Sequence, residues 1–332
     1  MSRKRRPASI IALAITTLAI AAVLWMGWSY FGPGPAARDG AATDVVLPKG
    51  AGVGQIARSL SKAGVIRSTD VFYLAAKLTG QARRLKAGEY EFRSGATMGQ
   101  VLAAIANGRV VRRFVVAPEG WTSEMVADAV RAEPVLTGEV ATPPEGSILP
   151  DGYQIQRGED RTEVIGKMRA ARDALLAELW AGRDPTVPLK TPEEAVTLAS
   201  IVEKETGVPS ERPRIAAVFE NRLRAGGKLE SDPTIIYGLT KGRPLGRPLT
   251  HAEVVAPAPY NTYVIAGLPP GPIANPGRAS LAAVLNPPKS DEMYFVADGT
   301  GGHAFATTFA AHQANVDRWR EFRRKQAAGG GK

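Results

Sequence analysis

The side chain of this sequence best suited to acid–base chemistry is Glu205, in the run Leu198-Ala-Ser-Ile-Val-Glu-Lys-Glu-Thr206. At about 100° per residue of an α-helix, Glu205 projects between Ile201 and Val202, whereas Glu203 projects about 140° away from Leu198. Burial among apolar side chains disfavours the charged form of a carboxyl and raises its pKa, as a general acid requires. In the alternative interpretation, Glu205 is a helix-end residue that forms an ordinary ion pair with Arg212, Arg214 or Arg222.

The helix that carries this run has signals at both ends. Thr191 can serve as the N-cap, Pro192 suits the first turn, and Glu194 completes a Thr-x-x-Glu capping box. Gly207 and Pro209 are expected to end the helix. The sequence therefore predicts that Glu205 lies in the last turn.

Composition excludes several classes of site. The chain has 332 residues, 44% of them hydrophobic and 22% charged, enough for about two folded domains. It has no cysteine, so disulfides, thiolate metal sites and cysteine nucleophiles are excluded. Its three histidines share no i, i+4 helical spacing, so we expect no metal site and no cofactor; they are His251, His303 and His312.

The N-terminus predicts a membrane anchor. A basic cluster over residues 3–6 precedes residues 10–31, which carry no charge and span about 33 Å as a helix. Aromatic residues typical of a membrane interface gather at the far end: Trp25, Trp28, Tyr30 and Phe31. The positive-inside rule keeps the basic cluster cytoplasmic and exports the rest. A cleaved signal peptide, with a site at Ala36-Ala37, is the alternative. The net charge of +10 suits nucleic acid, but an exported domain meets none, so no nucleic-acid partner is expected.

Changes in composition and hydrophobic pattern along the chain predict an α+β protein with a single N-terminal transmembrane helix. We expect two folded modules, both with strands and amphipathic helices. Residues 229–276 are expected to be mostly irregular and functional. The last module is expected to close with strands at 293–297 and 304–307 and a helix from about 309 to 326. The expected divisions are a cytoplasmic tail (1–9), a transmembrane helix (10–31), a linker (32–43), a first module (44–117), a second domain (118–326) and a disordered tail (327–332).

A series of motifs resembles the endolytic murein transglycosylases of the YceG-like family. The motifs occur in order: Ser200-Ile-Val-Glu-Lys-Glu-Thr206, Glu211-Arg212, Val218-Phe-Glu-Asn-Arg222, Leu229-Glu-Ser-Asp-Pro-Thr234, Pro259-Tyr-Asn-Thr-Tyr263, Gly267-Leu-Pro-Pro-Gly271 and Phe295-Val-Ala-Asp-Gly299. Residues 44–117 are similar to the LysM-like module that precedes the catalytic part of that family. One departure is Glu145-Gly-Ser-Ile-Leu-Pro150, where family members often carry aromatics, so a stacking contribution from residues 147–149 is in doubt.

The resemblance implies a periplasmic catalytic domain on the inner membrane that cleaves the β-1,4 bond between N-acetylmuramic acid and N-acetylglucosamine inside peptidoglycan glycan strands. It implies a 1,6-anhydromuramoyl product, with Glu205 acting first as general acid and then as base. Peptidoglycan synthases are candidate partners, and ending nascent glycan strands is a candidate role. Two alternatives stay open: a hydrolase acting on the same bond, and a glycan-binding scaffold without catalysis.

Further residues in the matching motifs suit sugar binding, because aromatic faces stack on pyranose rings and amides both donate and accept hydrogen bonds. For the aromatics the alternative is burial with satisfied hydroxyls. Asp232 is either a second carboxylate at the site or a cap of the turn before Pro233. Ser200 has no neighbouring base and is not expected to be a nucleophile. The predicted substrate-binding residues are Asp232, Tyr237, Tyr260, Asn261 and Tyr263.

Overall fold

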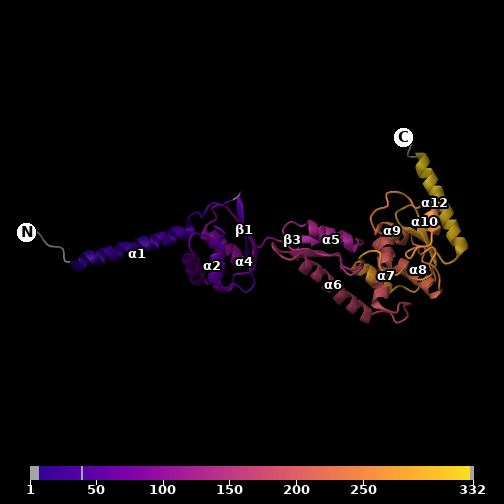
Figure 1. Cartoon of the computed structure of the whole chain (residues 1–332), viewed down its shortest axis with the longest axis horizontal. Helices are drawn as coiled ribbons and strands as arrows, with labels where there is room; N and C mark the ends of the chain where they lie inside the picture. The colour runs from indigo at the N-terminus through magenta and orange to yellow at the C-terminus, as the bar shows by residue number, and fades with distance from the viewer. Residues whose placement is uncertain (1–6, 39, 330–332) are drawn as a thin grey trace, which may run out of the picture. The chain divides into compact units, whose positions relative to one another are not determined.

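The computed structural model describes residues 7–38 and 40–329 and has a mixed α+β fold, as predicted. Its three sheets each contain two strands. The chain divides into two compact units, residues 1–113 and 114–332, whose elements are labelled in Figure 1. Most of the basic tail predicted at 1–9 and the end of the tail predicted at 327–332 lie outside the described residues.

The first unit combines an apolar helix with a small α+β module. Helix α1 (Pro7–Phe31) contains the stretch Ile11–Phe31, which is long and apolar enough to cross a membrane, a property that signal sequences share. Strands β1 (Ala42–Leu47) and β2 (Gly88–Arg93) pair antiparallel. A capping box formed by Thr97 and Gln100 begins the last helix, and the left-handed Gly108 ends it. The helices of the module are α2 (Val53–Lys62), α3 (Thr69–Leu78) and α4 (Met98–Asn107).

The second unit begins with a two-stranded sheet packed against two helices. Strand β3 (Arg113–Val116) pairs with β4 (Gly152–Ile155). Helices α5 (Ser123–Ala132) and α6 (Arg161–Ala181) pack against each other, and Val126, Ile148 and Met168 are fully buried between these elements.

Helix α7 (Pro192–Glu205) is the centre of the main core. It contacts α6, α8 (Arg212–Arg224) and α11 (Arg278–Leu285). Every residue from 195 to 202 is buried, so α7 is covered on all sides rather than along one apolar stripe. Thr191 accepts from the Glu194 backbone N–H as predicted, at 3.2 Å. The Glu194 carboxylate instead accepts from the backbone N–H of Lys190, so the predicted capping box is only half formed.

The stretch 229–276, predicted to be mostly irregular, is mostly irregular in the structure, but two helices that were not predicted lie within it. They are α9 (Asp232–Thr240) and α10 (His251–Val255). Asp232-Pro-Thr234 favours a turn, but proline is equally compatible with the first turn of a helix, and Ser231 occupies the N-cap position. The eight-residue α11 was not predicted either. The closing elements are confirmed: β5 (Tyr294–Ala297), β6 (His303–Ala306) and α12 (Phe309–Gly329).

Candidate active site

Glu205 is the last residue of α7. It is largely enclosed by neighbouring residues, and part of it is exposed to solvent. Its carboxylate accepts a hydrogen bond from the hydroxyl of Ser231, which is buried at the start of α9. Burial raises the pKa of Glu205 to about 7. The Ser231 hydrogen bond opposes this rise, and the charge of Asp232 adds to it. The group can therefore hold a proton near neutral pH.

The ion pair considered as the alternative for Glu205 does not form. Among the described residues, no arginine or lysine lies within ion-pair distance of the Glu205 carboxylate. The three candidate arginines bind other carboxylates: Arg212 that of Glu203 at 3.3 Å, Arg214 that of Glu292, and Arg222 that of Glu230 at 3.6 Å. Without an ion pair, the carboxylate form of Glu205 is stabilised by the Ser231 hydroxyl and by the more distant charges of His303 and Arg222.

Glu203 differs from Glu205 in its partners rather than in its burial. The helical-wheel prediction that Glu203 lies off the buried face is wrong, since its side chain is only 4% exposed. The reason is that neighbouring elements cover α7 all round. Glu203 accepts from the guanidinium of Arg212 and, at 2.9 Å, from the backbone N–H of Gly277. Paired in this way, Glu203 suits a structural role, and Glu205 remains the candidate acid.

A tightly bonded loop sets the position of the Ser231 hydroxyl. Glu230 has a left-handed backbone (φ 53°), which costs a non-glycine residue roughly 1 kcal/mol. The Ser231 backbone N–H donates to Thr262 Oγ1 at 3.0 Å, and Thr234 Oγ1 donates to the Ser231 carbonyl at 2.7 Å. The two threonine hydroxyls are 2.9 Å apart. These buried bonds hold the strained turn that aims Ser231 at Glu205.

Asp232 and Tyr263 lie beside the Glu205 carboxyl. The Tyr263 hydroxyl donates to Asp232 Oδ1 at 2.8 Å, and Asp232 is exposed. Burial and the nearby Asp232 raise the pKa of Tyr263, so the phenol stays a hydrogen-bond donor. The structure therefore brings two of the predicted binding residues to the proposed acid, with Asp232 in the first turn of α9 rather than in an irregular loop.

Asn261 uses its side chain inside the protein. It is buried, and its amide donates to the carbonyls of Glu253, Val254 and Ala256 at 3.2, 2.9 and 2.7 Å. Its Oδ1 accepts from the backbone N–H of Tyr263 at 3.0 Å. Asn261 therefore holds the loop that carries Tyr263 in place.

Tyr237 and Tyr260 form an aromatic pair with ring centroids 5.0 Å apart. The Tyr237 hydroxyl donates to Glu145 Oε2 at 3.3 Å, and Tyr237 is buried while Tyr260 is partly exposed. Burial raises the pKa of Glu145, although backbone N–H groups of Ser123 and Gly146 oppose that rise. Tyr260 is partly exposed, whereas Tyr237 fits the buried alternative.

Sequence reasoning missed the hydroxyl that bonds the Glu205 carboxylate. Ser231 was not identified, although a serine directly before Asp-Pro is a recognisable N-cap signal. His303 Nδ1 lies 2.7 Å from Glu211 Oε2, and the charges of His303 and Arg222 both lower the pKa of Glu205. Burial acts to raise the pKa of Glu211, but its hydrogen bonds with His303 outweigh burial and lower it. No sequence signal joins residues so far apart in the chain.

The described residues offer neither an accessible Ser200 nucleophile nor a cluster of metal ligands. Ser200 is fully buried; its hydroxyl donates to Thr197 at 2.7 Å and accepts from the Ile273 N–H at 3.0 Å. Within residues 7–38 and 40–329, no group of three or more His, Asp or Glu side chains is arranged to hold a metal ion. The arrangement is that of a single carboxyl acid with a hydroxyl partner.

Comparisons with known proteins relate this chain to one family. The model of the YceG-like family matches residues 45–318. The endolytic murein transglycosylase of Bacillus subtilis (strain 168) is 26% identical over 318 residues, covering 86% of this chain and 87% of the relative. That of Streptococcus pneumoniae (strain D39) is 30% identical over 324 residues, and this chain spans 57% of its length. A putative yceG-like protein of Listeria monocytogenes aligns with a TM-score of 0.51 at 30% identity, covering 82% of this chain and 98% of that structure.

Proposed function

This chain belongs to the YceG-like family, and from that premise we propose that it is an endolytic peptidoglycan lytic transglycosylase. The observation that carries the proposal is Glu205, a carboxyl without a cation partner whose pKa burial raises to about 7. A group with this pKa donates a proton efficiently near neutral pH and can take it back in a later step. The names of the relatives from Bacillus and Streptococcus agree with this activity.

In the proposed reaction, a single carboxyl performs both proton transfers. Glu205 gives its proton to the glycosidic oxygen as the bond from that oxygen to the anomeric carbon breaks. The 2-acetamido group of the muramic acid stabilises the oxocarbenium-like centre, in place of the second carboxylate of ordinary glycosidases. The Glu205 carboxylate then accepts the proton of the C6 hydroxyl, whose oxygen bonds to the anomeric carbon. The acid is regenerated and no water is consumed.

The surroundings of Glu205 suit an anion that exists only for part of the cycle. Ser231 donates a hydrogen bond to the carboxylate, and the more distant charges of His303 and Arg222 stabilise it further. These groups stabilise the carboxylate without forming an ion pair that would keep it permanently ionised. The proton can therefore leave and return.

We assign glycan binding to the exposed polar and aromatic groups around the acid. Asp232 and Tyr263 form a hydrogen-bonded pair near Glu205, where they can bond sugar hydroxyls. The partly exposed Tyr260 can stack on a sugar ring, backed by Tyr237. Asn261 supports this surface by holding the loop that bears Tyr263.

Membrane anchoring through α1 is also part of the proposal. Met26 and Tyr30 of α1 pack against the core of the first unit, and Ser29 is buried. Cleavage after Ala37 would remove these contacts, which favours an anchor over a signal peptide. Residues 10–31 would then hold a LysM-like module and the catalytic domain on the periplasmic side of the inner membrane. Ending nascent strands beside a peptidoglycan synthase is the role that fits such a tether.

Matched variants of the two neighbouring carboxyls test the catalytic assignment. The full chain and its Glu205→Gln and Glu203→Gln variants are incubated with purified glycan strands, and the products are weighed by mass spectrometry. We expect anhydro ends from the parent chain, a loss of at least 100-fold for Glu205→Gln, and a smaller loss for Glu203→Gln. Products heavier by one water would identify a hydrolase instead. Full activity of Glu205→Gln would refute the assignment.

A further inference from the structure

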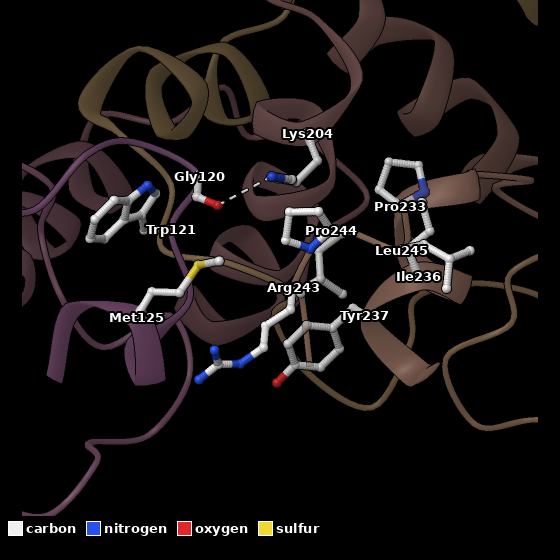
Figure 2. Close-up of a pocket in the computed structure, with 12 residues that line it drawn as sticks. Gly120, Trp121, Met125, Lys204, Pro233, Ile236, Tyr237, Arg243, Pro244 and Leu245 are labelled. Carbon is white, nitrogen blue, oxygen red and sulfur yellow. Dashed lines mark hydrogen bonds between the residues drawn. The ribbon is translucent and has the colours of Figure 1, made fainter. Parts of the chain in front are cut away.

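A cavity of about 420 Å³ lies beside the candidate active site and is not used by the mechanism above. The end of α7 contributes Lys204, the residue before Glu205, and α9 contributes Pro233, Ile236 and Tyr237. Across the cavity from Pro244 and Tyr237 lie Trp121 and Met125, as Figure 2 shows. Because Ser231, the N-cap of α9, bonds the Glu205 carboxylate, a ligand bound at Glu205 has this cavity within reach.

The charges at the cavity favour an anionic ligand. Among the described residues that line it, Lys204 and Arg243 carry the only full charges. The Lys204 ammonium donates to the Gly120 carbonyl at 3.3 Å and forms no ion pair in the described part of the chain. An ammonium has three donors, so Lys204 keeps free donors beside an apolar wall. A carboxylate is the group that would complete this arrangement.

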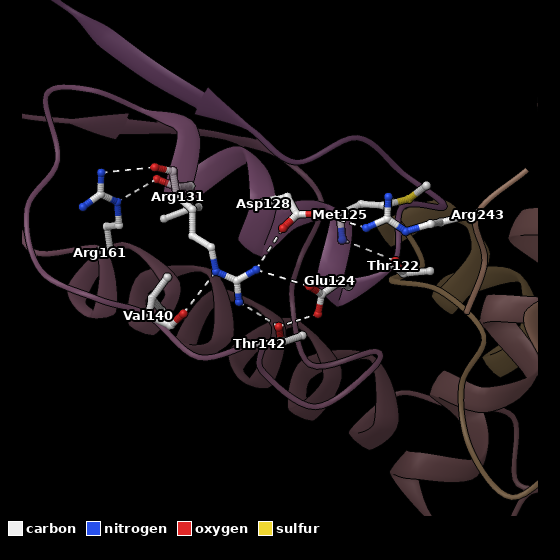
Figure 3. Close-up of polar contacts among 10 residues, drawn as sticks. Thr122, Glu124, Met125, Asp128, Arg131, Val140, Thr142, Arg161 and Arg243 are labelled. Atoms are coloured by element: carbon white, nitrogen blue, oxygen red, sulfur yellow. Dashed lines mark hydrogen bonds and ion pairs between the residues drawn. The ribbon is translucent and has the colours of Figure 1, made fainter. Parts of the chain in front are cut away.

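Arg243 is held at the cavity by a network on α5. Its guanidinium, 61% exposed, contacts Asp128 Oδ2 at 3.2 Å. The other oxygen of Asp128 accepts from Arg131 at 2.9 Å, and Arg131 also bonds Glu124 and Thr142 (Figure 3). Asp128 is thus shared between two arginines and neutralises Arg243 only in part. Arg243 therefore retains donors for a ligand.

The wall of the cavity disfavours a sugar ring. Sugars present hydroxyls on every edge and need acceptors as well as donors. The lining supplies apolar surface from Trp121, Met125 and Ile236, with cationic donors, and no side-chain carboxylate or amide. Trp121 is 37% exposed, so its ring is available to a ligand. Alkyl groups joined to carboxylates match this surface better than a sugar does.

We propose that this cavity binds the peptide stem attached to the muramic acid of the glycan, with Lys204 and Arg243 on its carboxylates and Trp121 against its alkyl groups. The inference rests on the proposed glycan substrate and narrows it to strands that still carry peptides. The stem leaves the sugar next to the bond that Glu205 would protonate, so binding of the stem positions that bond.

Kinetics on paired substrates test this assignment in the full chain. The substrates are uncrosslinked glycan strands with their peptides and the same strands after an amidase has removed the peptides. We expect the parent chain to prefer peptide-bearing strands in kcat/KM. Lys204→Met should reduce this preference about tenfold, mainly through KM, since it removes one charge-assisted hydrogen bond. Lys190→Met, a change of an exposed lysine just before the opposite end of α7, is the matched control and should leave the preference unchanged.

A binding measurement separates failure of the cavity from failure of the catalytic proposal. Calorimetry on the Glu205→Gln chain compares a disaccharide bearing a stem tetrapeptide with the peptide-free disaccharide. Tighter binding of the peptide form, weakened about tenfold by Lys204→Met or Trp121→Ala, supports the assignment whether or not the parent chain cleaves glycan. Equal binding of the two disaccharides, or a preference that both variants retain, overturns it.

Discussion

The strongest test of the Glu205 environment is the pH dependence of stability in a Glu205→Gln variant. The pKa of Glu205 rises from its usual value of 4.5 to about 7 on folding. Because the folded-state pKa is the higher one, the contribution of this group to stability is complete below pH 4.5 and is lost as the pH rises through 7. The parent chain should lose this contribution on going from pH 4 to pH 8, and Glu205→Gln should not.

The size of the effect follows from the pKa difference. At about 1.4 kcal/mol per pH unit, it amounts to roughly 3 kcal/mol of unfolding free energy between pH 4 and pH 8. A domain of about 200 residues shifts its Tm by about 2–4 °C per kcal/mol. The Tm of Glu205→Gln minus the Tm of the parent should therefore be about 6–12 °C larger at pH 8 than at pH 4. Burial raises the pKa of Glu220 to about 7 as well, but Glu220 titrates in both proteins and cancels.

Thermal unfolding of the full chain in mild detergent, followed by near-ultraviolet circular dichroism, measures this difference. Glu203→Gln is the control, since it removes one of the two carboxylate partners of the largely buried Arg212 and should lower the Tm at both pH values. If the Tm difference between parent and Glu205→Gln is the same at pH 4 and pH 8, the carboxyl is not destabilised by burial and the reasoning fails.

Two further variants test the groups around the acid. Ser231→Ala removes a hydrogen bond that lowers the pKa of Glu205, so the alkaline limb of the kcat/KM profile should move to higher pH; a limb that stays in place or moves to lower pH would contradict this role. Asn261→Ala leaves three carbonyls without their donor and should lower the unfolding free energy by about 2–4 kcal/mol in urea unfolding. A loss of under about 0.5 kcal/mol would show that the loop bearing Tyr263 does not depend on this side chain.

Local signals predicted most of the elements and the candidate acid. The capped helix that ends near Glu205 and the closing hairpin and helix are all present. These features depend on residues close together in sequence, where caps, glycines and apolar periods act directly. Helix α9 was not predicted, because Asp-Pro-Thr suits both a turn and the first turn of a helix.

The sequence by itself determined that a carboxyl would end a largely apolar helix, with a long apolar segment at the N-terminus. Tertiary structure alone decided which of two neighbouring carboxyls stays without a cation. Glu203 and Glu205 are both enclosed, but Arg212 and the Gly277 backbone reach one, while Ser231 reaches the other. The pKa of a carboxyl depends on charges and donors within a few ångströms, and residues far apart in the chain supply them only after folding.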